Sequence, residues 1–84
     1  KAAIEIAVDA SVAYAVPQKI TGKKDFTLSL RPKRPGRGCT VLVKQGNETI
    51  ASKKFAKVLP AEMIQLPVSA ERIDPGKNLE ITII

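Results

Sequence analysis

The fold is decided by residues 39–57, which read CTVLVKQGNETIASKKFAK. In the first run, residues 39–45, Val41 and Val43 stand at alternate positions, and this period of two is typical of a β-strand with one buried face. The second run, residues 49–57, is expected to be the partner strand. A glycine and an asparagine, which tolerate the positive φ of tight hairpin turns, lie between the two runs. The stretch therefore predicts a β-hairpin.

Apolar residues alternate in the same way on both sides of the hairpin. The runs are Ile4-Ile6-Val8, Phe26-Leu28-Leu30, Ile64-Leu66-Val68 and Leu79-Ile81-Ile83. A further extended stretch is expected over residues 12–20, at a sheet edge, because Pro17 has no amide hydrogen to donate to a ladder. Residues 31–38 hold two prolines, two glycines and four basic side chains, so we expect them to form a loop outside the sheets.

The spacing of these strands predicts the fold class. About seven short strands, separated by turns roughly every 8 to 12 residues, indicate an all-β protein with an immunoglobulin- or fibronectin-like antiparallel β-sandwich. An open barrel is the alternative. The length of 84 residues fits one domain, residues 1–84, with a modest core. The three aromatic residues, Tyr14, Phe26 and Phe55, are expected at core positions in strands.

Few side chains in this sequence are suited to catalysis. There is no histidine, and Cys39 is the single cysteine, which excludes a disulfide within the chain. A nucleophilic cysteine needs a nearby base, so we expect Cys39 to be structural and the domain on its own to be no enzyme. We identify no catalytic, metal-binding or cofactor-binding residue. No apolar run reaches the roughly 20 residues that span a bilayer, and the cysteine usage indicates a cytoplasmic protein.

Positive charge is concentrated in one short segment. The net charge is +6, and the basic patch consists of Arg31, Lys33, Arg34 and Arg37. Such a patch attracts polyanions, which makes nucleic acid or an acidic protein a candidate partner of a stand-alone binding module. Recognition of single-stranded nucleic acid usually adds exposed aromatic side chains, and because these are expected in the core here, nucleic acid is the less favoured partner. Basic strand residues also protect sheet edges from pairing with other chains, which is the simpler interpretation.

Several segments resemble a known family. They are residues 14–20 (YAVPQKI), the strand and basic loop at 26–35, the hairpin, Ser52-Lys53-Lys54, and residues 59–63 (LPAEM). In this order they resemble the C-terminal accessory domain of bacterial FAD-dependent oxidoreductases of the pyridine nucleotide-disulfide type. The resemblance covers most of residues 12–66, and none of its segments is a catalytic signature.

The resemblance implies a division of labour within a longer chain. An upstream Rossmann region would bind FAD, while this domain, excised from the C-terminal part, would pack against that region or mediate dimer contacts. A start at Lys1, without an initiator methionine, agrees with this expectation. No flavin-contacting residue carries over, because the glycine fingerprint is absent from the sequence. The residues that the resemblance marks for docking are Tyr14, Pro17, Gln18, Pro60, Glu62 and Met63.

Overall fold

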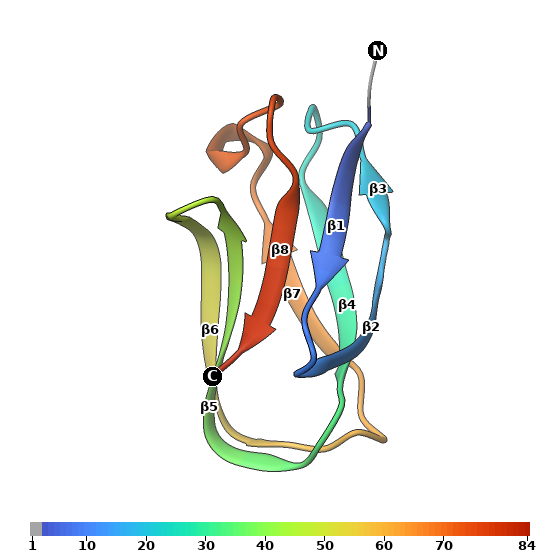
Figure 1. Ribbon diagram of the computed structural model, residues 1–84, viewed down its shortest axis with the longest axis vertical. Coiled ribbons are helices and arrows are strands. Elements are labelled where there is room, and N and C mark those ends of the chain that lie inside the picture. Colours follow the sequence, from blue (N-terminus) through green and yellow to red (C-terminus); the bar gives the residue numbers. More distant parts are fainter. Residues whose placement is uncertain (1–2) are drawn as a thin grey trace.

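The computed structural model describes residues 3–84, which form eight β-strands and one short 3₁₀-helix (Figure 1). The elements are β1 (Ile4–Val8), β2 (Val12–Val16), β3 (Lys19–Ile20), β4 (Phe26–Pro32), β5 (Gly36–Gln45), β6 (Glu48–Val58), β7 (Ile64–Val68), η1 (Ala70–Arg72) and β8 (Leu79–Ile83). One sheet has the strand order β3-β1-β8-β5-β6, and the other has the order β2-β4-β7. The two sheets face each other, and the prediction of an all-β protein is confirmed.

The described strands number eight, against about seven expected, because the stretch at residues 12–20 divides in two. β2 pairs with β4 in the smaller sheet, whereas β3 pairs with β1 in the larger sheet. The division falls at Pro17, which follows Val16 through a cis peptide bond. Pro17 therefore lies between two strands and not within one, and both β2 and β3 are edge strands of their sheets, as expected for this stretch.

One strand pair is parallel, so the expectation of a purely antiparallel sandwich is wrong for that pair. β1 runs parallel to β8, with Ile6 opposite Leu79 and Val8 opposite Ile81. A parallel pair needs a long connection, because the chain must return to the end at which it started. Here the connection is the whole segment from β2 to η1, and β1 and β8 consequently lie side by side although they are at opposite ends of the sequence (Figure 1).

The hairpin predicted at residues 39–57 is confirmed. The pairing of β5 with β6 ends at Gln45 and Glu48, which leaves Gly46 and Asn47 as a two-residue turn. Gly46 has a φ of 61°, in the left-handed region that the first position of such a turn requires and that a side chain disfavours.

The expectation of a loop over residues 31–38 is wrong at both ends. β4 continues to Pro32 and β5 begins at Gly36, so only residues 33–35 lie between the two strands. Proline is tolerated at the end of a strand, where few ladder hydrogen bonds are lost. Glycine is suited to the start of β5 because a Cβ on Gly36 would lie 2.7 Å from the sulfur of Cys39.

The core lies between the sheets and is built from alternate strand residues. Its most deeply buried members, each at most 1% exposed, come from both sheets. They are Leu28, Leu30, Val41, Val43, Leu79 and Ile81. Two predicted core residues lie outside: Val8 is 39% exposed at the end of β1, and Tyr14 is 42% exposed. Tyr14 points outward because the register of β2 shifts between Val12 and Tyr14, which breaks the alternation.

A buried polar side chain at the end of β5 forms hydrogen bonds with the β7–β8 connection. Gln45 is 1% exposed, and its amide nitrogen donates hydrogen bonds to the carbonyl oxygens of Asp74, at 2.8 Å, and Lys77, at 2.9 Å. Its amide oxygen accepts a hydrogen bond from the backbone N–H of Asp74 at 2.8 Å. The turn at residues 74–77 is therefore held by a side chain from a distant part of the sequence.

A second polar cluster joins the β1–β2 turn to β8. One carboxylate oxygen of Asp9 accepts hydrogen bonds from the backbone N–H (2.8 Å) and the hydroxyl of Ser11, and the other accepts one from the hydroxyl of Thr82. The Ser11 hydroxyl oxygen accepts a hydrogen bond from the backbone N–H of Ile83 at 2.9 Å. Partial burial acts to raise the pKa of Asp9, but these hydrogen bonds outweigh it and hold the pKa below its ordinary value.

Candidate docking surface

The described residues contain no cluster of metal ligands: nowhere in residues 3–84 do three or more His, Cys, Asp or Glu side chains come together to hold a metal ion. In the same part of the chain, no helix has the length and apolar character needed to cross a membrane. Cys39 is a free thiol that is half-buried in β5 and packs against the core. The features that stand out are an exposed sheet face and a group of cations.

The outer face of the three-stranded sheet carries exposed apolar side chains. We define this outer face by Tyr14, Val16, Ser29, Arg31 and Met63. The β2–β4 register places Tyr14 opposite Arg31 and Val16 opposite Ser29. The exposed fractions are 42% for Tyr14, 49% for Val16 and 40% for Met63. Exposed apolar side chains that gather on one face are candidates for contact with another molecule.

Arg31 lies at the centre of the outer face and is half-buried. Its guanidinium carbon is 5.7 Å from the centroid of the Tyr14 ring, a cation–π contact. The Nε atom of Arg31 is buried and has no hydrogen-bond acceptor within the described part of the chain. Buried donors without a partner are uncommon in folded proteins. Packing on an aromatic ring thus fixes this side chain, and its charge is available to another molecule.

Met63 extends this arrangement to the edge strand β7. The last paired residues of β4 and β7 are Leu30 and Ile64. Arg31 follows Leu30 and Met63 precedes Ile64, so the antiparallel register brings Arg31 and Met63 next to each other. We infer from this register, extended by one residue past the ladder, that Tyr14, Arg31 and Met63 form one row across the sheet.

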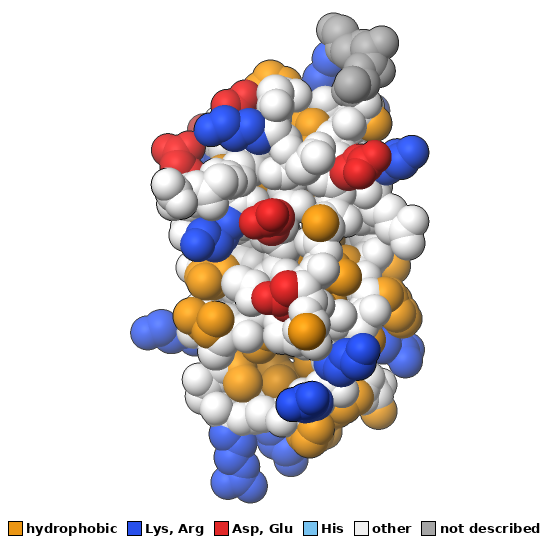
Figure 2. All heavy atoms as spheres, viewed as in Figure 1, with side chains coloured by type: hydrophobic (Ala, Val, Ile, Leu, Met, Phe, Trp, Pro, Cys, Tyr) orange, Lys and Arg blue, Asp and Glu red, His pale blue; other side chains and the backbone are white. Residues whose placement is uncertain are grey.

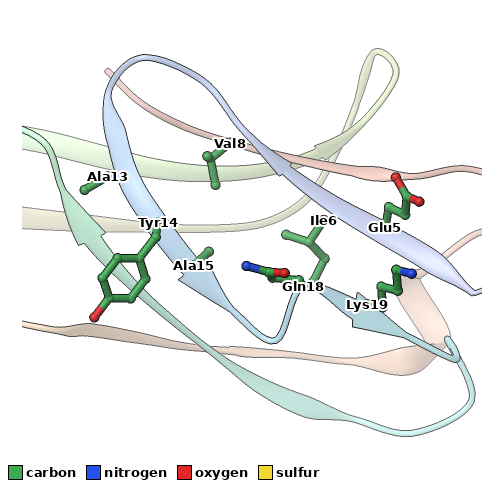
Figure 3. Close-up of a pocket in the computed structure, with 8 residues that line it drawn as sticks. All are labelled: Glu5, Ile6, Val8, Ala13, Tyr14, Ala15, Gln18 and Lys19. Carbon is green, nitrogen blue, oxygen red and sulfur yellow. The ribbon is translucent and has the colours of Figure 1, made fainter.

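The other residues marked by the resemblance lie beside the outer face or on a loop. Gln18 is exposed and lines, together with Tyr14, a hollow of about 410 Å³ between β1 and β2 (Figure 3). Pro17, next in sequence to Gln18, is half-buried. Pro60 and Glu62 are exposed on the β6–β7 connection that leads into the outer face. Of the six marked residues, two lie on the outer face, two at its flank and two on this loop.

Three members of the outer face, Val16, Ser29 and Arg31, were not marked for docking by the sequence. The sequence groups Arg31 with residues 33–37, but its guanidinium lies against the Tyr14 ring on the outer face. The signal that finds it is alternation: Leu30 faces the core, so the next residue of the strand faces outward. Val16 has no such signal, because the register shift in β2 hides its orientation.

The remaining basic residues gather at one end of the molecule. Lys33, Arg34 and Arg37 are exposed at the β4–β5 loop and the start of β5. Lys57 on β6 pairs with Arg37 and adds a fourth cation. Figure 2 shows Lys and Arg side chains projecting from the lower end, where Figure 1 places this loop. We name Lys33, Arg34, Arg37 and Lys57 the basic end.

Comparison of the chain with models of protein families, with curated proteins and with solved structures found no match. The structure defines an all-β protein with two facing sheets. Its surface carries the outer face, with exposed apolar side chains, and the basic end. The interactions available to these two surfaces are aromatic stacking, apolar contact and charge pairing, which are those of molecular recognition.

Proposed function

We propose that the chain is a non-catalytic docking domain whose outer face packs against another protein surface. The exposed Tyr14 ring against Arg31, with the exposed Met63 at the end of the neighbouring ladder, is the observation that carries this proposal. Aromatic residues, methionine and arginine are enriched in protein interfaces, where they bury a large area and Arg adds directional hydrogen bonds. On docking, the exposed tyrosine and methionine lose contact with water, and Arg31 meets a carboxylate or carbonyl oxygen of the partner.

The partner in this proposal is the flavin-binding region of a FAD-dependent oxidoreductase of the pyridine nucleotide-disulfide type, located upstream in the same chain. Support comes from Tyr14 and Met63, which belong to two separate segments of the resemblance and lie on one face of the sheet. FAD would be bound by the upstream region and not by this domain. We place the protein in the cytoplasm, because the free thiol of Cys39 fits a reducing compartment.

We also propose that the two sheets form a sandwich of the immunoglobulin or fibronectin type. The edge strands of the larger sheet are β3 and β6, and those of the smaller sheet are β2 and β7. A closed barrel would pair such edge strands with each other, so the linear strand orders favour the sandwich over a closed barrel.

Capture of the flavin-binding region by this domain tests the docking proposal, with the two produced as separate chains in one host. This domain carries an affinity tag, and the co-purified flavin is measured by its visible absorbance. The double variant Tyr14→Ala, Met63→Ala is expected to retain about a tenth of the captured flavin or less, because it removes the two large apolar contacts. The control is Ser52→Ala, Lys54→Ala, which changes exposed side chains of β6 in the other sheet. Undiminished capture by the Tyr14 and Met63 variant would refute the outer face as the docking surface.

Sedimentation equilibrium of the domain alone distinguishes a homodimer from docking on a flavoprotein. A monomer at concentrations of about 100 μM agrees with the proposal, because a face built for another protein has no need to be self-complementary. A dimer that dissociates in the Tyr14 and Met63 variant would instead assign the outer face to contacts between two copies of this chain.

A further inference from the structure

The basic end is built from the β4–β5 loop and the start of the β5–β6 ladder, and it uses different residues from the outer face. Lys33 and Arg34 belong to the three-residue β4–β5 loop, and Arg37 faces Lys57 near the start of the β5–β6 ladder. All four side chains are exposed. Because the ladder fixes the backbone spacing of two of the cations and the loop is short, little backbone freedom is lost when a ligand binds.

Two shallow hollows open at the basic end and share Pro35 and Val58 in their walls. The first has a volume of about 350 Å³, and Arg34 lines it together with mostly apolar side chains. The second has a volume of about 300 Å³ and is lined by the Arg37 and Lys57 pair and by apolar residues. No acidic side chain is among the residues that line either hollow. Each hollow thus combines an apolar wall with a cation.

We propose that the basic end binds an acidic segment of a partner protein in which aliphatic residues are interspersed among the acidic ones. Carboxylates of the segment pair with the cations, and its aliphatic side chains enter the two hollows. Complementary charge aligns such a segment and speeds its association, while apolar contact in the hollows adds affinity that salt does not remove. This binding is independent of the proposed docking through the outer face.

The positions of the aromatic residues favour a protein ligand over nucleic acid. Single-stranded nucleic acid is held by stacking of its bases on exposed aromatic side chains. Within residues 3–84, Phe26 and Phe55 are packed against the core, and Tyr14 lies on the outer face against Arg31. The basic end therefore provides charge and apolar hollows but no stacking surface.

Fluorescence anisotropy with a defined peptide tests this inference. The probe is a short fluorescein-labelled peptide in which one leucine follows every two glutamates. The triple variant Arg34→Gln, Arg37→Gln, Lys57→Gln is expected to bind it at least about tenfold more weakly than the parent. The matched control is Lys23→Gln, Lys24→Gln, Lys77→Gln, which changes exposed lysines of other loops. Both variants lower the net charge from +6 to +3, and the control is expected to lose less than about twofold.

Two further probes decide the class of ligand. A peptide with serine in place of each leucine is expected to bind several-fold more weakly, and an oligothymidylate of similar charge is expected to bind more weakly than the leucine peptide. Equal losses in the two triple variants would overturn the inference, because net charge alone would then explain binding. Equal affinity for the serine peptide, or tighter binding of the oligothymidylate, would overturn it as well. Far-UV circular dichroism verifies that both triple variants are folded.

Discussion

Replacement of Gln45 by methionine is expected to lower the free energy of unfolding by about 2 to 3 kcal/mol. The side chain makes three hydrogen bonds of 2.8–2.9 Å to the backbone of Asp74 and Lys77, and each contributes a net of about 1 kcal/mol. Methionine has a similar size and shape, so Gln45→Met removes the polar contacts without opening a large cavity. The three hydrogen bonds are part-buried, so the loss is expected to be close to their sum.

Equilibrium unfolding in urea, monitored by far-UV circular dichroism, measures this loss. A domain of this size is expected to have a total stability of about 4 to 12 kcal/mol, so the loss is a large fraction of it. With a slope of about 1 kcal/mol per molar urea, the midpoint moves down by about 2 to 3 M. Gln65→Met is the control, because Gln65 is an exposed glutamine of β7.

The reasoning about Gln45 is refuted if Gln45→Met and Gln65→Met have the same midpoint. A second readout locates the effect within the structure. Amide hydrogen exchange at Asp74 is expected to accelerate in Gln45→Met, because its N–H no longer has the Gln45 oxygen as an acceptor.

Two other predictions concern stability. Gly22→Ala is expected to lower the free energy of unfolding in urea by about 2 kcal/mol or more, and Gly38→Ala by about 1 kcal/mol. Both glycines have a positive φ, 81° at Gly22 and 60° at Gly38. Only at Gly22 would the new Cβ meet another residue, 2.7 Å from Cδ1 of Ile4. Equal costs would contradict this. Because the pKa of Asp9 is lower in the folded state, its ionised carboxylate stabilises the fold. This contribution is fully present above the unfolded-state pKa of about 4 and is lost as the pH falls through the lower folded-state pKa. Asp9→Asn is thus expected to be less stable than the parent at pH 7, with a difference that shrinks in acid; a difference independent of pH speaks against this role.

The candidate site could be predicted from the sequence only in part. The resemblance marks Tyr14 and Met63, but nothing local shows that residues so far apart in the chain lie in one row across a sheet. Their proximity depends on β4, which pairs with β2 on one side and with β7 on the other. Arg31 joins Tyr14 through the same register, a contact that its grouping with the basic residues in sequence does not reveal.

The sequence by itself determined that the protein is built from β-strands and where most of them lie. Alternation at Val41 and Val43 and the glycine at position 46 are local signals, because backbone geometry alone sends successive side chains to opposite faces and makes a tight turn depend on positive φ. Apart from the β5–β6 hairpin, tertiary structure alone decided which strands pair, where the register shifts in β2, and that Gln45 is buried. These outcomes depend on partners distant in the chain: the amide of Gln45 is satisfied only because the β7–β8 connection folds over it, and no pattern around residue 45 encodes that contact.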